Sequence, residues 1–178
     1  LKVTKTKGKV AALEAKLLAE GNNSGYIGMG HTRWATHGIP NDENSHPHIS
    51  NSGDLVIIHN GIIENYDTLK TELIKRGYTF ESDTDTEVLV NLIEEIQTKT
   101  GLKLGEAVQL ALKEVVGAYA IVVFDIIKPD ELVVAKMGSP LAIGIGDNEY
   151  FIGSDASPFL AFTNKAIYLE DGQVALVR

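Results

Sequence analysis

Apolar positions along this chain follow two spacings, one typical of helices and one typical of strands. Apolar residues three or four positions apart predict helices over residues 10–18, 66–76, 86–99 and 104–116. Gly21-Asn22-Asn23 is expected to stop the first of these helices. Unbroken apolar runs bounded by turn residues predict strands over residues 26–31, 55–59, 119–127, 131–137, 141–146, 150–153, 166–170 and 173–177. Helices grouped in the middle, with strands before and after them, favour one α+β domain.

Two stretches do not fit a regular element. Residues 32–54 are polar and lack clear periodicity, and a connection of that length is more often a binding loop or a lid than a plain linker. The chain opens with Leu1-Lys2-Val3, an alternation typical of a half-exposed strand, and it does not begin with Met. We therefore expect a fragment that lacks its natural beginning.

Composition narrows the classes of function. The chain has 178 residues, with 16 basic and 24 acidic side chains and a net charge of −8, so nucleic acids and anionic membranes are unlikely partners by charge. No apolar run approaches the roughly 20 residues of a membrane helix. No secretory signal pattern is present, and we expect a cytoplasmic protein. Zero cysteines exclude a disulfide, a thiolate zinc site and a cysteine nucleophile within these residues.

The histidines raise the question of a metal. All five lie in one window together with Trp34, the one tryptophan: His31, His37, His46, His48 and His59. Imidazole suits zinc, copper or iron, but neither a His-Glu-x-x-His helix nor another recognised ligand spacing is present. We expect ordinary loop and strand-end histidines, with no metal and no cofactor.

An acidic run precedes the third predicted helix. It spans Glu81 to Glu87, and Thr84-Asp85-Thr86-Glu87 matches a capping box. A calcium loop is disfavoured because the glycine such a loop needs is absent. Asp85 would then stand at the start of a rigid helix, where its carboxylate could bind an ammonium group.

Two further segments carry the strongest chemical signals, and each follows a predicted strand. In His31 to Gly38, Arg33 offers a planar fork for a carboxylate, Thr36 a hydroxyl and Trp34 an apolar cover. In His59 to Asn65, the Asn60 amide and the Gly61 N–H are two donors that could converge on one oxyanion. Asn-Gly between apolar stretches is also typical of a type I′ hairpin turn, and that alternative stays open.

Taken together, these segments resemble the glutaminase domain of the glutamine–fructose-6-phosphate aminotransferase family, within the class II glutamine amidotransferases. The resemblance covers nearly the whole chain, so residues 1–178 are interpreted as one glutaminase domain. The matching motifs are Arg33-Trp34-Ala35-Thr36-His37-Gly38, Ser45-His46-Pro47-His48, residues 59–65, Gly77-Tyr78-Thr79-Phe80, Thr84-Asp85-Thr86-Glu87, Gly117-Ala118-Tyr119 and Gly138-Ser139-Pro140-Leu141.

The resemblance implies a fold and a reaction. The fold would be the N-terminal-nucleophile hydrolase sandwich, four αββα layers, truncated at its N-terminus. The family hydrolyses glutamine to glutamate and ammonia through a thioester on an N-terminal cysteine. The ammonia passes to a sugar isomerase domain, where fructose 6-phosphate becomes glucosamine 6-phosphate. The full-length enzyme is expected to be a homodimer, whereas this piece could be monomeric.

By matching position, the resemblance also assigns roles. Arg33, with Thr36 and the backbone at His37, would bind the glutamine α-carboxylate, and Asp85 would hold the α-ammonium. Asn60 and Gly61 would form the oxyanion hole, and Trp34 would close over the site. Because the nucleophilic cysteine is absent, we expect these 178 residues to be inactive alone. Two alternatives remain: a non-catalytic amino-acid-binding or assembly module, and the glutaminase domain of a phosphoribosyl-amine-forming amidotransferase.

Overall fold

Two antiparallel sheets form the centre of the structure, a computed structural model that describes residues 1–21 and 24–178. The larger sheet has the strand order β1-β2-β3-β4-β8, and the smaller has the order β6-β5-β7. The strands are β1 (His48–Ile49), β2 (Leu55–Ile63), β3 (Gly117–Asp125), β4 (Leu132–Met137), β5 (Ala142–Ile145), β6 (Tyr150–Gly153), β7 (Ala166–Tyr168) and β8 (Val174–Val177).

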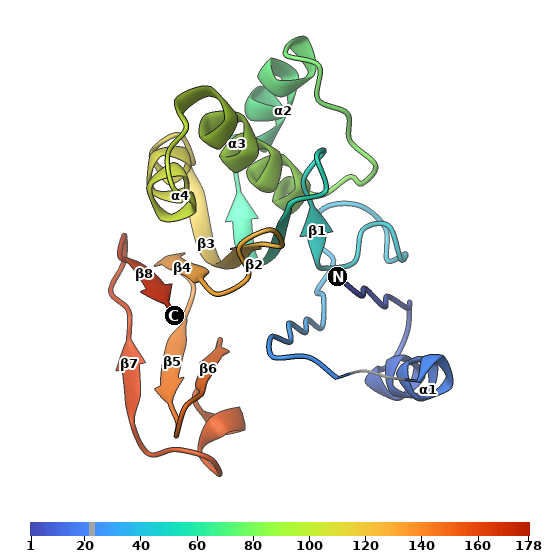
Figure 1. The fold of residues 1–178 in the computed structure, drawn as a ribbon. Helices are drawn as coiled ribbons and strands as arrows, with labels where there is room; N and C mark the ends of the chain where they lie inside the picture. Colours follow the sequence, from blue (N-terminus) through green and yellow to red (C-terminus); the bar gives the residue numbers. More distant parts are fainter. Residues whose placement is uncertain (22–23) are drawn as a thin grey trace.

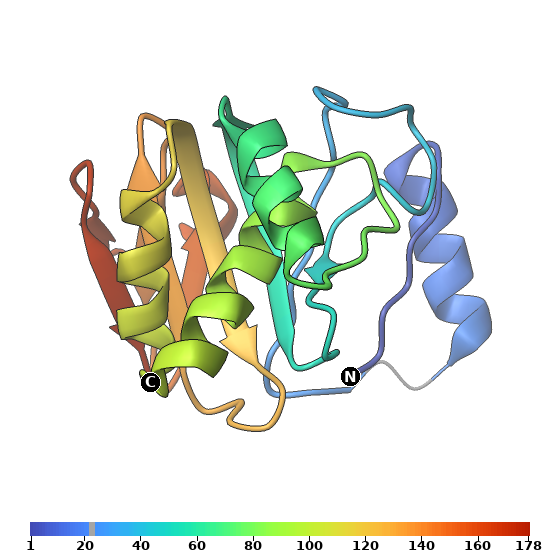
Figure 2. The same cartoon turned by 90° about the horizontal axis from the view of Figure 1, so that it is seen from above.

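Four α-helices are formed by the described residues: α1 (Val10–Glu20), α2 (Tyr66–Lys75), α3 (Asp85–Thr100) and α4 (Leu104–Lys113), with one 3-10 turn, η1 (Ser157–Phe159). Figure 1 shows α2, α3 and α4 together on one face of the larger sheet, with the smaller sheet on its other face. The same grouping is seen from above in Figure 2, where α1 stands apart from these helices. The structure therefore confirms the α+β class.

Strand β3 shows how the layers are held together. Tyr119, Ile121 and Val123 pack with the helices in one apolar cluster. Ala120 and Val122, which point to the opposite face, pack with residues of the smaller sheet in a second cluster. Because side chains alternate along a strand, one apolar run supplies both cores, which explains why it reads as continuously apolar in the sequence.

Helix α3 is the most buried of the helices, and its start is fixed by polar contacts. The Thr84 hydroxyl accepts a hydrogen bond from the Glu87 N–H at 3.3 Å, as an N-cap residue does. The Glu87 carboxylate, however, accepts from the backbone N–H groups of Glu81 and Ser82, at 2.9 and 2.7 Å. The predicted capping box is thus half formed, because Glu87 ties down the preceding loop instead of bonding back to Thr84.

The prediction for β2 was too short. The strand does not end at Asn60-Gly61 but pairs with β3 in register through Ile63, so the alternative of a hairpin turn at this dipeptide is wrong. Gly61 lies opposite Tyr119 and has φ +130°, and a Cβ there would lie 2.1 Å from the Ala118 carbonyl oxygen. Glycine lets the ladder continue where any side chain would stop it.

Two predicted strands near the N-terminus are absent. Residues 1–3 and 26–31 form neither helix nor strand, because no strand of the described chain pairs with them. Helix α1 has its predicted place and has Gly21 as its C-cap, whereas Asn22 and Asn23 lie outside the described residues. The long segment 32–54 is irregular as predicted, apart from the two-residue strand β1.

Candidate functional site

One cavity of about 300 Å³ is lined by every residue that the sequence singled out for substrate binding and catalysis. It lies between the loop over residues 31–37, strand β2 and the start of α3. The seven predicted residues that line it are Arg33, Trp34, Thr36, His37, Asn60, Gly61 and Asp85. Such a volume is at the lower end of the range for small-molecule sites, which suits a ligand of amino-acid size.

Asp85 is the acidic pole of this cavity, and its side chain is nearly fully buried. Its Oδ2 atom accepts a hydrogen bond from the backbone N–H of Ile63 at 2.8 Å. Its Oδ1 atom lies 3.9 Å from Nδ1 of His37, whose ring packs edge-on against Tyr66. One carboxylate oxygen is therefore used by strand β2, and the other faces the cavity edge with unused acceptor capacity.

Arg33 is the basic pole of the cavity, and its side chain forms hydrogen bonds within its own loop. The guanidinium donates to the backbone carbonyls of His37, Gly38 and Ile39. A guanidinium has five N–H donors, so at least two remain for a ligand. Burial lowers the pKa of Arg33, and the negative charges of Asp85 and Asp83 oppose that shift.

Asn60 and Gly61 lie side by side on β2. The Asn60 Oδ1 atom is 2.7 Å from Nε2 of His31, which places the amide at the cavity wall. Gly61 has a positive φ, and its missing side chain makes room for the Ala118 carbonyl of β3, so Gly61 lines the cavity with backbone atoms alone. Trp34 lines the same cavity but is 89% exposed, so it stands at the opening without covering it.

Four of the five histidines form a cluster at the cavity that sequence reasoning did not foresee, with His48 and His59 buried and His31 and His46 half-buried. The rings of His31 and His46 are 3.9 Å apart, and those of His46 and His48 are 5.0 Å apart. The Thr86 hydroxyl lies 3.2 Å from Nε2 of His46 and 3.0 Å from Nδ1 of His59. Burial lowers the pKa of all four of these histidines, to about 3 for His48, so the cluster is uncharged at neutral pH.

His31, His46 and His59 line the cavity, as do Thr32, Thr84, Thr86 and Ser154, none of which was predicted as a site residue. The crowding of histidines in one window was the available signal for the first three. Ser154 comes from a loop after β6, far along the chain, and nothing in its sequence context marks it. Among the described residues, no group of three or more histidine or acidic side chains is arranged to hold a metal ion.

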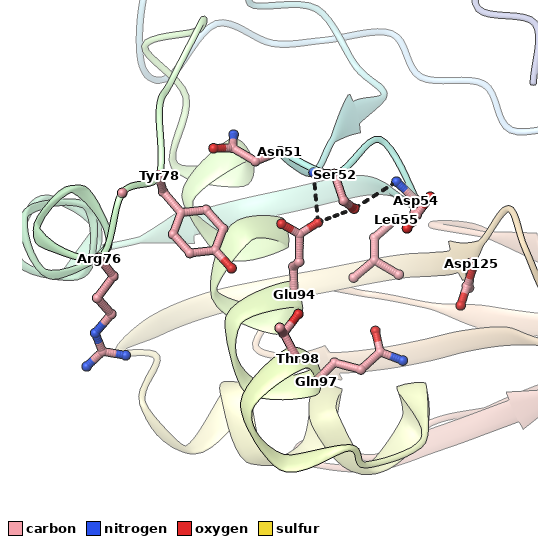
Figure 3. A pocket seen from close by; sticks show the side chains of 11 residues that line it. Asn51, Ser52, Asp54, Leu55, Arg76, Tyr78, Glu94, Gln97, Thr98 and Asp125 are labelled. Atoms are coloured by element: carbon pink, nitrogen blue, oxygen red, sulfur yellow. Dashed lines mark hydrogen bonds between the residues drawn. The ribbon is translucent and has the colours of Figure 1, made fainter.

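A larger cavity, of about 610 Å³, lies near the opposite end of β2. Its walls include Asn51, Arg76 and Tyr78, and burial raises the pKa of Tyr78. Figure 3 shows the Glu94 carboxylate in this cavity facing Ser52, whose backbone N–H and hydroxyl donate to it at 3.1 and 2.5 Å. None of the predicted site residues lies here, so the candidate chemistry belongs to the smaller cavity.

The fold and this cavity define a class of protein. The family model described as "Glutamine amidotransferase domain" matches residues 19–176, and the chain belongs to that family. Its fold is the N-terminal-nucleophile hydrolase sandwich, as predicted. Within the described residues, no helix is both long and apolar enough to cross a membrane.

Individual relatives narrow the assignment. The chain is 52% identical, over 99% of its length, to glutamine–fructose-6-phosphate aminotransferase (isomerizing) of Bacteroides thetaiotaomicron, and 53% identical, again over 99%, to the protein of that name from Chlorobaculum tepidum. It spans 29% of the length of each. Among solved structures, glutamine phosphoribosylpyrophosphate amidotransferase of B. subtilis aligns with a TM-score of 0.65 and 30% identity, over 82% of this chain and 31% of that one.

Proposed function

We propose that residues 1–178 form one glutaminase domain that binds glutamine in the cavity of Arg33 and Asp85. The observation that carries this proposal is that a guanidinium, a carboxylate, a side-chain amide and a glycine backbone from distant parts of the chain line one cavity of about 300 Å³. A zwitterionic amino acid carries a carboxylate and an ammonium group, which are opposite in charge to Arg33 and Asp85, respectively. Arg33, aided by Thr36 and the backbone at His37, takes the α-carboxylate, and Asp85 takes the α-ammonium.

The amide carbon of the bound glutamine then lies toward Asn60 and Gly61. The Asn60 Nδ2–H and the Gly61 N–H donate to the oxygen that becomes negative when a nucleophile attacks that carbon. A cysteine thiolate is the nucleophile that the family uses, and none of these 178 residues is a cysteine. Trp34 closes over the occupied site from its exposed position at the opening.

In the whole protein, we propose that the ammonia released here converts fructose 6-phosphate to glucosamine 6-phosphate in a sugar isomerase domain, and that the full-length enzyme is a homodimer. The support is the identity of 52% to aminotransferases of fructose 6-phosphate, against 30% to the solved phosphoribosylpyrophosphate amidotransferase. The phosphoribosyl-amine-forming alternative is correspondingly less favoured.

Calorimetry of the purified chain with glutamine and with glutamate tests the pocket. Arg33→Ala and Asp85→Asn should each weaken binding by about 30-fold or more, because each leaves one charge of the zwitterion unpaired. Arg178→Ala and Asp130→Asn remove charges of the same sign elsewhere on the surface and should leave binding unchanged. Equal affinity in all four variants, or stoichiometric zinc binding without amino-acid binding, would overturn the proposal.

A further inference from the structure

His31 contacts the side-chain amide of Asn60. Nε2 of His31 lies 2.7 Å from Oδ1 of Asn60, and both residues line the candidate cavity. An amide oxygen only accepts hydrogen bonds, so the proton of this contact is on Nε2 of His31. The amide is planar, and its NH₂ group therefore points to the side away from His31.

The direction of this amide matters for the chemistry proposed above. Asn60 serves as an oxyanion donor only if its NH₂ group, and not its oxygen, faces the reacting carbon. The two ends of the amide have nearly the same shape, so packing alone discriminates poorly between them. Among the described residues, His31 is the hydrogen-bond partner of the Asn60 side chain, so this contact favours one of the two orientations of the amide.

The ring of His31 is itself held in place. It lies 3.9 Å from the ring of His46, at an interplanar angle of 32°. His46 in turn contacts the Thr86 hydroxyl on α3 at 3.2 Å. Burial, with the nearby charge of Arg33, lowers the pKa of His31, while hydrogen bonds to the Asn60 side chain and to the His59 backbone oppose this shift, so the ring is neutral and carries one N–H.

We propose that His31 is a positioning residue for the oxyanion hole: its Nε2–H holds the oxygen of Asn60 so that the Asn60 NH₂ group faces the substrate. The inference rests on the proposed function. It assigns no proton transfer to His31, and the ring acts through Asn60 alone.

Kinetics of glutamate release test this inference in a version of the chain extended by the family's cysteine-led opening segment. His31→Leu should lower kcat about 10- to 100-fold with KM within about twofold, because a transition-state contact is lost while ground-state binding stays. His31→Gln should retain at least about a third of kcat, since the Gln amide can donate from the position of Nε2. His48→Leu removes a buried imidazole outside the cavity and should lower Tm without changing kcat.

A double-mutant comparison separates this inference from the proposed function. If Asn60→Ala lowers kcat and His31→Leu adds little to it, the two residues act as one unit. If Asn60→Ala lowers kcat while His31→Leu does not, or while their effects multiply, the inference fails and the proposed function stands. If Asn60→Ala has no effect on kcat, the proposed oxyanion hole itself fails.

Nitrogen-15 spectra of the 178-residue chain give an answer that needs no turnover. The His31 ring should be neutral with its proton on Nε2, and His31→Leu should shift the side-chain amide signal of Asn60. A proton on Nδ1 of neutral His31, or an unchanged Asn60 amide signal in His31→Leu, would overturn the inference.

Discussion

Asp85 accepts a hydrogen bond from the backbone N–H of Ile63, 2.8 Å away, and so joins the first residue of α3 to the last residue of β2. Asn60 and Gly61 are on the same strand, three and two positions before Ile63, respectively. The carboxylate proposed for the substrate ammonium and the donors proposed for the oxyanion are thereby held at a fixed spacing.

Variants of Asp85 should separate stability from binding. Asp85→Ala leaves the buried Ile63 N–H unpaired and should lower the free energy of unfolding by about 1–3 kcal/mol. Asp85→Asn keeps an acceptor oxygen and should lower it less. Both lose the charge for the ligand and should bind glutamate about equally weakly. Urea unfolding and calorimetry measure the two effects, and a stable Asp85→Ala chain would contradict the structural role of this hydrogen bond.

Gly61→Ala should destabilise the chain by about 2 kcal/mol or more, because a Cβ would lie 2.1 Å from the Ala118 carbonyl oxygen at a φ of +130°. Gly28→Ala is the matched control, since a Cβ there has nothing within 4 Å and its φ is not in the left-handed region. Thermal unfolding of both variants tests the difference. Equal Tm values would show that β2 and β3 separate at this position without cost.

The free energy of unfolding should fall as the pH is lowered from neutral. Burial lowers the folded-state pKa of His48 from its ordinary value of 6.5 to about 3. Between these two pH values the unfolded chain binds a proton at His48 that the folded chain does not, so stability is lost as pH falls through this window. The slope for one such histidine approaches about 1.4 kcal/mol per pH unit.

Urea unfolding at several pH values measures this slope. The shifts at His31, His46 and His59 have the same direction and should add to it. His48→Gln should reduce the slope below pH 6, and a variant with the slope of the parent would show that His48 is protonated in the folded chain.

The 178-residue chain should release no glutamate from glutamine, because it has no cysteine to form a thioester. The chain extended by the cysteine-led segment should release it, and replacing that cysteine with alanine should abolish the activity again. Equal turnover with and without the segment would place the nucleophile elsewhere.

The sequence predicted most of the layered core, since the apolar spacing of α2, α3 and α4 and the runs of β3 to β6 are strong local signals. It failed at β2, where an Asn-Gly dipeptide has a local preference for a turn but lies opposite Tyr119 and Ala120 in a ladder. It failed at residues 26–31, because an apolar run becomes a strand only when another strand pairs with it.

For the site, the sequence singled out charged and donor residues by their chemistry, and the structure brings them to one cavity, while their roles stay a prediction. The hydrogen bond of His31 to Asn60 and the sharing of Thr86 by His46 and His59 are contacts across 27 or more residues. No local spacing encodes them. The exposure of Trp34 was equally unpredictable, since a tryptophan is more often covered.

The pairing of β2 with β3 near the site is tight on both strands. On the partner strand β3, Gly117 lies opposite Ile63 and also has φ +130°, and a Cβ there would lie 2.1 Å from the Ile62 carbonyl oxygen. A protein engineer who transplanted this part of β2 into another antiparallel scaffold would therefore have to keep both glycines, because a side chain at the position of Gly117 would collide with the backbone of the grafted strand.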